Sequence, residues 1–290
     1  MPLISMKPML QDAKRDGYGV AAFNIIDYNS ARSVISAAQD LNSPVIVQLS
    51  VKTIRLWGYD AIASWVKSLA QNVDVPVALH LDHCADLDVI QRCIDAGWTS
   101  VMFDGSDMPF EENLSMTLKA YALATQANVA LEAELGAIGG VEDDKVVSLE
   151  SAMLADFQEC LQFCTEMPEL AAFAPAIGTA HGQYKGEPVI AYDLLEKITE
   201  NIDTPIALHG GTGLADAQFE RCIRSGCAKV NISTMHKHQF IEGFVTFALQ
   251  KPGVKEPIPY IESQFLMLKD GVESMISKFG SQQRAGSWTH

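Results

Sequence analysis

Eight short runs of apolar, mostly β-branched residues recur along this chain, each followed by a stretch with helical spacing. The runs are too continuous for strands with one solvent-exposed face, so they predict a parallel sheet covered on both faces. Eight strand–helix units in succession favour a closed (β/α)8 TIM barrel. The runs lie at residues 19–25, 44–50, 75–83, 100–106, 129–137, 170–179, 204–213 and 228–234.

The segments between the runs carry signals of helix ends. Residues 109–128 open with proline and acidic side chains, as a helix N-terminus does. Gly97 and Gly226 stand where the C′ glycine of a helix is expected. Residues 258–279 predict an additional C-terminal helix, packed outside the barrel. An open doubly wound sheet is the alternative, but it calls for a phosphate-binding loop after residues 19–25, where none follows.

Length and composition predict one large domain over residues 1–290. No stretch rich in Pro, Gly or Ser suggests a domain boundary. The one long connection, at residues 137–148, predicts a mobile loop.

The chain is acidic, with 21 Lys and Arg against 36 Asp and Glu, a formal charge of −15. This balance argues against nucleic acid and anionic membranes as partners, because both require basic patches. An anionic substrate would have to be bound by local groups such as backbone amides or a metal ion. No secretory signal or membrane-spanning run is evident, and six cysteines without a CxxC pair predict a reduced, cytoplasmic protein.

Three histidines stand at the C-terminal ends of different predicted strands, where barrel enzymes build their active sites. His83 ends the third strand, His181 follows the sixth, and His209 ends the seventh. Three protein ligands with an open position are typical of catalytic zinc, so these residues predict a metal site. His80, three residues before His83, should face the other way and is interpreted as structural.

Carboxylates occupy the neighbouring strand ends. Asp104 ends the fourth strand, and Glu132 and Glu134 lie in the fifth, where a charge is costly unless it is paired or bound to metal. Glu134, nearer the rim, is assigned to the site. Asp104 and Glu134 would bind a second or alternative metal position, or orient the histidines from behind. A buried ion pair with a lysine is the alternative.

Two polar segments follow the seventh and eighth strands, where barrels often bind phosphate. Residues 210–213 read Gly-Gly-Thr-Gly, and residues 231–234 read Asn-Ile-Ser-Thr. Glycines let backbone N–H groups approach an anion, and a following helix N-terminus adds its dipole. These segments therefore predict a phosphate site that needs few lysines.

Together these motifs resemble the class II fructose-1,6-bisphosphate and tagatose-1,6-bisphosphate aldolases, in order over nearly the whole chain. The motifs are HLDH at 80–83, SVMFDGS at 100–106, FEEN at 110–113, EAELGAIGGVED at 132–143, AIGTAHGQYKG at 176–186, LHGGTG at 208–213 and KVNIST at 229–234.

The resemblance implies reversible cleavage of a phosphorylated ketose to dihydroxyacetone phosphate and an aldehyde. His83, His181 and His209 would hold one Zn²⁺, which stabilises the enediolate that cleavage leaves. Asp82 would be the general acid/base at the C4 oxygen, and Glu142, on the predicted loop, would move the proton at the donor carbon.

The resemblance also implies a substrate-binding set, homodimers or homotetramers, and in some members a monovalent cation such as Na⁺ or K⁺ nearby. The substrate-binding set would comprise Ser50, Gly182, Lys185, Gly210, Gly211, Thr212, Asn231, Ser233 and Thr234. Three positions depart from the family pattern: Lys52 for a glycine, Met235 for an acidic residue and Thr212 for a serine.

The departures bear on the acceptor half of the substrate. Residues 251–262 carry no arginine to bind a distal phosphate, whereas Lys52 and Arg55 follow the second strand. One hypothesis is an altered anionic or polar aldehyde anchored by Lys52 or Arg55; the alternative is an ordinary bisphosphate with both residues in solvent. Lys229 opens the eighth strand and should lie at the opposite rim, so no Schiff base is expected.

Two other functions remain alternatives at this point. The barrel could be a different metal-dependent sugar-phosphate enzyme, such as an epimerase or a hydrolase, or a non-catalytic subunit that kept the fold. The presence of Asp82 and the three histidines argues against the second, and the pairing of Asp82 with Glu142 beside a phosphate site favours the aldolase over the first.

Overall fold

The eight apolar runs form one parallel sheet that closes on itself. A computed structural model describes residues 3–142, 145–147, 153–182 and 188–286. Around the barrel the strands are ordered β1-β11-β10-β8-β5-β4-β3-β2. Their bounds are β1 (Val20–Asn24), β2 (Val45–Ser50), β3 (Val77–Asp82), β4 (Ser100–Phe103), β5 (Ala130–Leu135), β8 (Ala172–Pro175), β10 (Ile206–Leu208) and β11 (Cys227–Ile232). The predicted barrel is confirmed, and the open sheet is excluded.

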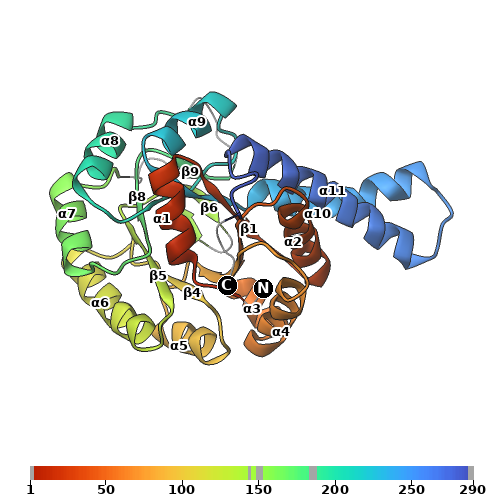
Figure 1. Ribbon diagram of the computed structural model, residues 1–290, viewed down its shortest axis with the longest axis horizontal. Helices are drawn as coiled ribbons and strands as arrows, with labels where there is room; N and C mark the ends of the chain where they lie inside the picture. Colours follow the sequence, from red (N-terminus) through yellow and green to blue (C-terminus); the bar gives the residue numbers. More distant parts are fainter. Residues whose placement is uncertain (1–2, 143–144, 148–152, 183–187, 287–290) are drawn as a thin grey trace.

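Helices surround the barrel (Figure 1). They are α1 (Met6–Asp16), α2 (Tyr28–Asp40), α3 (Val51–Trp57), α4 (Tyr59–Ala70), α5 (Leu87–Asp95), α6 (Phe110–Gln126), α7 (Phe157–Glu166), α8 (Tyr192–Asn201), α9 (Asp216–Arg224), α10 (Thr234–Gln250) and α11 (Pro257–Lys278). Outward-facing strand residues such as Val47, Leu79 and Leu81 are fully buried in the core beneath these helices. Because the strands are covered on both faces, they read as continuous apolar runs.

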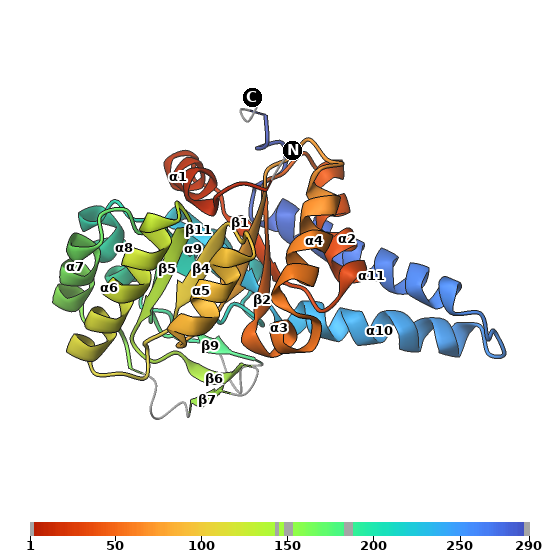
Figure 2. The ribbon, with the colours of Figure 1, turned by 90° about the horizontal axis from the view of Figure 1, so that it is seen from below.

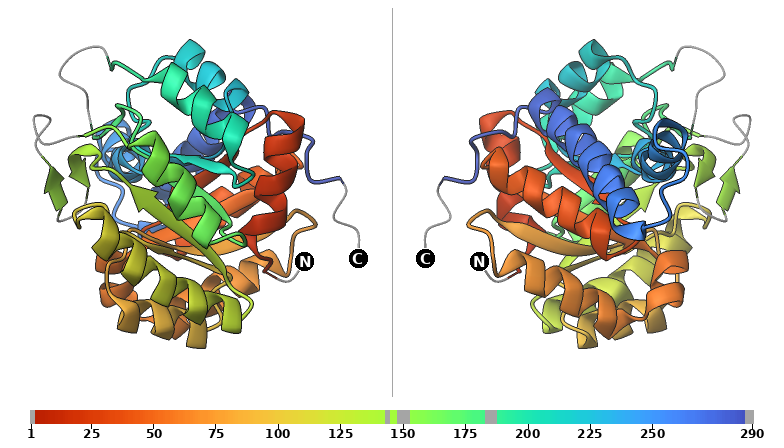
Figure 3. Two further views of the ribbon diagram at one scale, coloured as in Figure 1. Left: turned by 90° about the vertical axis from the view of Figure 1, so that its left-hand side faces the viewer. Right: turned by 90° about the vertical axis from the view of Figure 1, so that its right-hand side faces the viewer.

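One end of the barrel is sealed by α1. Met6, Met9 and Leu10 are fully buried against inward-facing alanines that include Ala22 and Ala78. Small side chains on the inner face leave room for the helix, which therefore closes this end with apolar contacts. Figures 2 and 3 show α1 at one end of the barrel and the strands β6, β7 and β9 at the other. Any solvent-accessible site inside the barrel must open at that second end.

The connection at residues 137–148 is not an irregular loop in its described part. β6 (Gly139–Glu142) pairs antiparallel with β7 (Lys145–Val147) and parallel with β9 (Ala180–His181). Gly140 has φ +110°, and a Cβ there would lie 2.1 Å from the carbonyl oxygen of His181. Glycine at position 140 thus allows the close approach of β6 to the strand that carries His181.

Two long helices, α10 and α11, lie side by side and extend away from the barrel (Figures 1 and 2). The predicted C-terminal helix is confirmed, and it packs on α2 as well as on α10. Asn29 of α2 donates through Nδ2 to the Oε1 of the buried Gln264, at 2.8 Å. Within the described residues, no helix combines the length and the apolar character that crossing a membrane requires.

Candidate active site

The three predicted histidines meet at the open end of the barrel. One ring nitrogen from each of His83, His181 and His209 lies within 4.8 Å of the others. The ring centroids of His83 and His209 are 4.7 Å apart, and those of His83 and His181 are 5.2 Å apart. His83 follows β3 with φ 45°, a left-handed conformation that few non-glycine residues adopt. Three separate segments of the chain thus bring together three imidazole nitrogens that could bind one metal ion.

The carboxylates of Asp104 and Glu134 lie beside this cluster, as predicted. Asp104 Oδ2 is 2.9 Å from His83 Nδ1, and Glu134 Oε2 is 3.0 Å from His209 Nδ1. Ser106 donates to the other oxygen of Asp104 through its backbone N and its Oγ. His83, Asp104 and Glu134 also form a second group whose donor atoms are mutually within 4.8 Å. Both roles proposed for these carboxylates are compatible with their positions.

Glu132, which the sequence left without a role, faces the same interior. Its Oε1 lies 2.8 Å from His209 Nε2, and its Oε2 lies 2.9 Å from Lys229 Nζ. All three side chains are fully buried. The buried ion pair with a lysine, which was the alternative for Glu134 and Asp104, is formed instead by Glu132 and Lys229.

Two predictions about the direction of side chains are wrong. Lys229 does not lie at the opposite rim, because its long side chain runs inside the barrel to Glu132 and Asn231. His80 does not point away from the site, since its Nε2 lies 3.4 Å from Glu132 Oε2. The left-handed conformation at His83 interrupts strand alternation, so spacing from His80 did not predict their relative direction.

The charges of this interior are strongly coupled. Burial alone would raise the pKa of Glu132, but Lys229 and His209 hold it well below its usual range. Burial lowers the pKa of His209, whereas the carboxylates of Glu132 and Glu134 raise it, to about 9 overall. Burial and the charge of Lys229 lower the pKa of His80, which is therefore neutral. The carboxylates around His209 thus favour a cation at this ring, either a second ring proton or a metal ion that displaces it.

The donor set fits a divalent transition metal. A carboxylate can only accept hydrogen bonds, so the contact with Glu132 places the ring proton of His209 on Nε2 and leaves the Nδ1 lone pair for a ligand. With the ring proton on Nε2, His209 Nδ1 and Glu134 Oε2 are two buried acceptors that face each other at 3.0 Å. Buried polar atoms in this state call for a partner, and imidazole nitrogen with carboxylate oxygen is a donor set that zinc accepts.

Asp82 stands next to the cluster at the end of β3 and is almost fully buried. Asn24 Nδ2 donates to Asp82 Oδ2 at 2.7 Å, and Asn231 Nδ2 donates to Asp82 Oδ1 at 3.2 Å. Two neutral amides from β1 and β11 therefore hold the carboxylate from both sides without neutralising its charge.

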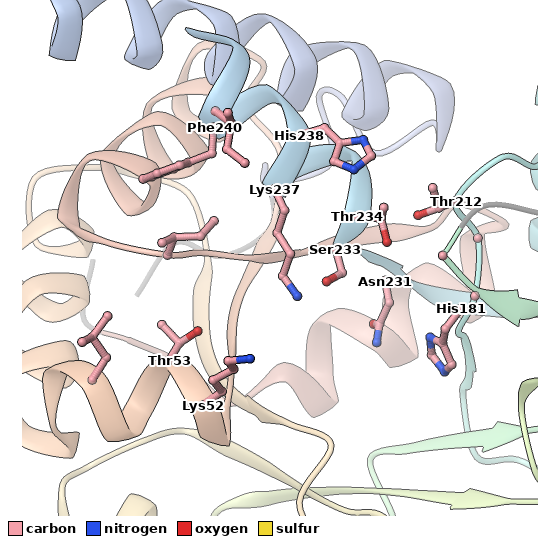
Figure 4. A pocket seen from close by; sticks show the side chains of 16 residues that line it. Lys52, Thr53, His181, Thr212, Asn231, Ser233, Thr234, Lys237, His238 and Phe240 are labelled. Carbon is pink, nitrogen blue, oxygen red and sulfur yellow. The ribbon is translucent and has the colours of Figure 1, made fainter. Parts of the chain in front are cut away.

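A pocket of about 600 Å³ opens beside the histidines (Figure 4). Its lining contains most of the predicted substrate-binding set: Gly182, Gly210, Gly211, Thr212, Asn231, Ser233 and Thr234. Ser50 is outside the lining but lies next to Asp82 in the pairing of β2 with β3. Lys185 lies outside the described residues.

Gly210 also has a packing role. It has φ +67°, and a Cβ would lie 2.7 Å from the backbone of Ala180. The chain after β10 can therefore pass close to β9, which brings His209 and His181 to the same place.

Sequence reasoning missed one cation of the pocket. Lys237 and Lys52 both line it, and Figure 4 shows their side chains extending toward each other from α10 and α3. Lys237 follows Ser233 by four residues across the start of α10, so helical spacing could have placed both on one face. Arg55, the other hypothetical anchor, is not among the lining residues of this pocket.

Comparison with known proteins gives matches over almost the entire chain. The family model described as fructose-bisphosphate aldolase class-II matches residues 4–284. The chain is 38% identical over 288 residues to the fructose-bisphosphate aldolase of Staphylococcus aureus (strain Mu50 / ATCC 700699), covering 98% of this chain and 100% of the relative. It is equally identical, with the same coverage, to the probable fructose-bisphosphate aldolase of Bacillus subtilis (strain 168).

Solved structures agree with these matches. The YdjI aldolase from Escherichia coli K12 superposes with a TM-score of 0.86 at 26% identity, covering 98% of this chain and 99% of that one. A putative fructose-1,6-biphosphate aldolase from Coccidioides immitis gives a TM-score of 0.88 at 27% identity, covering 96% of each chain.

Proposed function

Because this chain belongs to the class II fructose-bisphosphate aldolase family and is therefore a carbon–carbon lyase, we propose that it reversibly cleaves a phosphorylated ketose into dihydroxyacetone phosphate and an aldehyde. The family is metal-dependent, and we propose Zn²⁺ as the metal, held by His83, His181 and His209. The convergence of these three histidines, with His181 lining the pocket and Asp82 next to His83 in the chain, is the observation that carries the proposal. The same family membership favours the aldolase over an epimerase, a hydrolase or a non-catalytic subunit.

The metal would serve as a Lewis acid, stabilising the negative charge that carbon–carbon cleavage leaves on the donor half. Asp104, at the end of the strand next to β3, keeps His83 in place at 2.9 Å. Glu134 of β5 lies 3.0 Å from His209 Nδ1. Since both carboxylates face the histidines, they also supply the oxygen atoms of an alternative metal position.

Asp82 is proposed as the general acid/base at the acceptor oxygen. In cleavage it takes the proton of the C4 hydroxyl as the bond breaks, and in condensation it returns that proton. The two amides that hold its carboxylate restrict its rotation, so the oxygen that exchanges the proton is already positioned. Such positioning is what makes general acid/base catalysis effective.

Glu142 is proposed to move the proton at the donor carbon. Its backbone lies in β6, whose pairing with β9 brings the strand next to His181. The side chain of Glu142 is outside the described part of the structure. The role therefore rests on the family resemblance and on the position of β6.

The phosphate of the donor is proposed to bind at the glycine-rich turn after β10 and at the end of β11. Gly182, Gly210 and Gly211 line the pocket, where backbone N–H groups can approach the anion. Ser233 and Thr234 begin α10, a helix of 17 residues whose N-terminal dipole favours negative charge. We propose Lys185 and a monovalent cation, Na⁺ or K⁺, as further parts of this site.

The acceptor half is proposed to end in an anionic group. Lys52 and Lys237 line the same pocket from α3 and α10, and Figure 4 shows them on the side away from His181 and Thr212. A bound distal anion would lie between two ammonium groups of this same chain. This arrangement supports Lys52, rather than Arg55, as the anchor.

A coupled assay tests the proposed function. The protein is incubated with a panel of ketose 1-phosphates and 1,6-bisphosphates, and release of dihydroxyacetone phosphate is followed by NADH oxidation. We expect turnover of at least one ketose phosphate, with a preference for substrates that carry a distal anion. No release from any member of the panel by zinc-loaded protein would contradict the proposal.

Two further properties are proposed with it. Exposed apolar residues of α10 and α11, including Ile241, Leu249 and Leu266, support a homodimer or homotetramer. The six cysteines are all buried and free, which supports a cytoplasmic location.

A further inference from the structure

A line of buried polar side chains crosses the barrel below the proposed metal site. Lys229 Nζ lies 2.6 Å from Asn231 Oδ1 and 3.1 Å from Glu132 Oε1. Asn231 continues the line to Asp82, and Glu132 continues it to His209. Four different strands or strand ends thus connect the proposed acid/base to a proposed metal ligand through one lysine.

The lysine determines which way the amide of Asn231 points. An amide has one accepting oxygen and one donating nitrogen, whereas an ammonium group can only donate. With Lys229 on one side, the Oδ1 of Asn231 must face Nζ, so Nδ2 must face the carboxylate of Asp82. Without the lysine, the amide could turn and present its oxygen to Asp82, which would repel the carboxylate instead of holding it.

The second amide that holds Asp82 is oriented less strictly. Asn24 Oδ1 accepts from Gln48 Nε2 at 2.8 Å. Gln48 is itself an amide and can turn, so it does not impose a direction on its own. Lys229 therefore sets the direction of this network, because its ammonium group can donate hydrogen bonds but cannot accept them.

Glu132 ties the same lysine to the metal ligand. It receives Lys229 on both carboxylate oxygens and lies 2.8 Å from His209 Nε2. As a carboxylate it fixes the tautomer of His209, with Nδ1 turned toward Glu134 and the other histidines. The positive charge of Lys229 keeps Glu132 ionised despite complete burial.

Stability alone does not account for such a pair. Replacing a buried ion pair with apolar residues is often neutral or stabilising, because two charges must be removed from water to form it. Lys229 is also unsuited to act as a nucleophile, since its Nζ is held by Glu132 and Asn231 and it does not line the described pocket.

We propose that Lys229 is a positioning residue, which orients the amide of Asn231 toward Asp82. The inference rests on the proposed role of Asp82. Asp82 acts only at the acceptor oxygen, whereas proton exchange at the donor carbon of dihydroxyacetone phosphate does not require it, so the two half-reactions should respond differently.

The test compares these half-reactions in a double variant, Lys229→Met with Glu132→Gln. The glutamine can still accept from His209 Nε2, and no buried charge is left without its partner. We expect kcat for cleavage to fall by about 10- to 100-fold, part of the roughly 10²- to 10⁴-fold that a positioned acid/base contributes. Donor-proton exchange should stay within about twofold, and bound zinc, measured by mass spectrometry, should remain at one ion per chain.

Lys14→Met is the matched control. Lys14 is half-buried in α1 at the sealed end, where Nζ donates to the carbonyl of Ile202 at 2.7 Å. The same substitution there should change neither half-reaction.

The outcomes are distinguishable. An unchanged cleavage rate in the double variant, or an equal loss of cleavage and exchange, would overturn the positioning role, and so would loss of zinc. Full cleavage by Asp82→Asn would instead refute the proposed function on which the inference depends.

Discussion

The two ends of this barrel are built on the same strands but from opposite chemistry. On β3 the inward-facing positions run from Ala78 through His80 to Asp82, and on β5 from Ala130 through Glu132 to Glu134. The alanines receive the apolar face of α1, while the polar side chains above them contact one another, as Glu132 does His209. A step of two residues along a strand therefore leads from the apolar layer that packs on α1 to the polar layer of the candidate site.

The difference shows how the barrel separates stability from function. At the sealed end, α1 inserts methionine and leucine side chains among small residues, and burial of apolar area stabilises the fold. At the open end, buried charges are tolerated because neighbours pair with them or donate hydrogen bonds to them, as Lys229 does for Glu132 and two amides do for Asp82. Changes at the open end should therefore affect catalysis most, and changes at the sealed end should affect stability most.

Metal removal should have the largest effect on the open end. A chelator should reduce cleavage to background, and Zn²⁺ should restore it, because the metal would supply the positive charge that stabilises the donor half after cleavage. Borohydride added with substrate should not inactivate the enzyme, since the buried Lys229 is paired. The measurement is residual dihydroxyacetone phosphate release. Substrate-dependent inactivation by borohydride would show that a lysine reacts covalently.

Asp82→Asn should have the next largest effect. The amide keeps the size of the carboxylate but cannot exchange the proton, so kcat should fall by about 10²- to 10⁴-fold. Zinc content and the thermal unfolding midpoint serve as controls and should stay near those of the unsubstituted protein. Loss of zinc in this variant would assign Asp82 to the metal site instead.

Lys52→Ala and Lys237→Ala should have a smaller, substrate-dependent effect. A hydrogen bond to a charged group contributes about 1.5–3 kcal/mol, so each change should lower kcat/KM by about tenfold or more for a ketose with a distal anion. A ketose 1-phosphate with a neutral distal end should react as before. Lys67→Ala, on the exposed surface of α4, is the control. Efficient, unaltered use of a bisphosphate by both variants would show that the lysines face solvent during turnover.

Leu10→Ala should have the smallest effect on catalysis. Leu10 is fully buried in α1, so its truncation should lower the free energy of unfolding by about 2–5 kcal/mol. The folded protein should keep its kcat, because α1 lies at the end away from the histidines. Urea denaturation and steady-state kinetics below the transition measure the two effects. If kcat of Leu10→Ala fell as much as kcat of Asp82→Asn, the proposed separation of stability and catalysis between the two ends would be wrong.

Much of the candidate site followed from local patterns. His83, His181 and His209 were predicted as a group because the C-terminal ends of parallel strands meet at one end of a barrel, whatever the helices between them do. Asp104 and Glu134 followed from the same rule. The ends of α5 and α9 were also predictable, since Gly97 and Gly226 do adopt positive φ there.

The hairpin of β6 and β7 was not predictable in this way. β6 pairs not only with β7 but also with β9, a strand of two residues about 40 positions further along the chain. Such long-range pairing leaves little trace in local composition, so residues 137–148 were interpreted as a loop. Only the contact of Gly140 with His181 explains why glycine stands there.

The sequence by itself thus determined the barrel, its polar end and the ligand-type residues there, because strand periodicity and strand-end position are local properties. Only the tertiary structure decided the partners of Lys229, Glu132 and His80. A long side chain near the start of a strand can reach toward the next layer, and what it meets there depends on residues brought from across the barrel. For Lys229 those residues are Asn231, two positions along the same strand, and Glu132, 97 positions earlier in the chain.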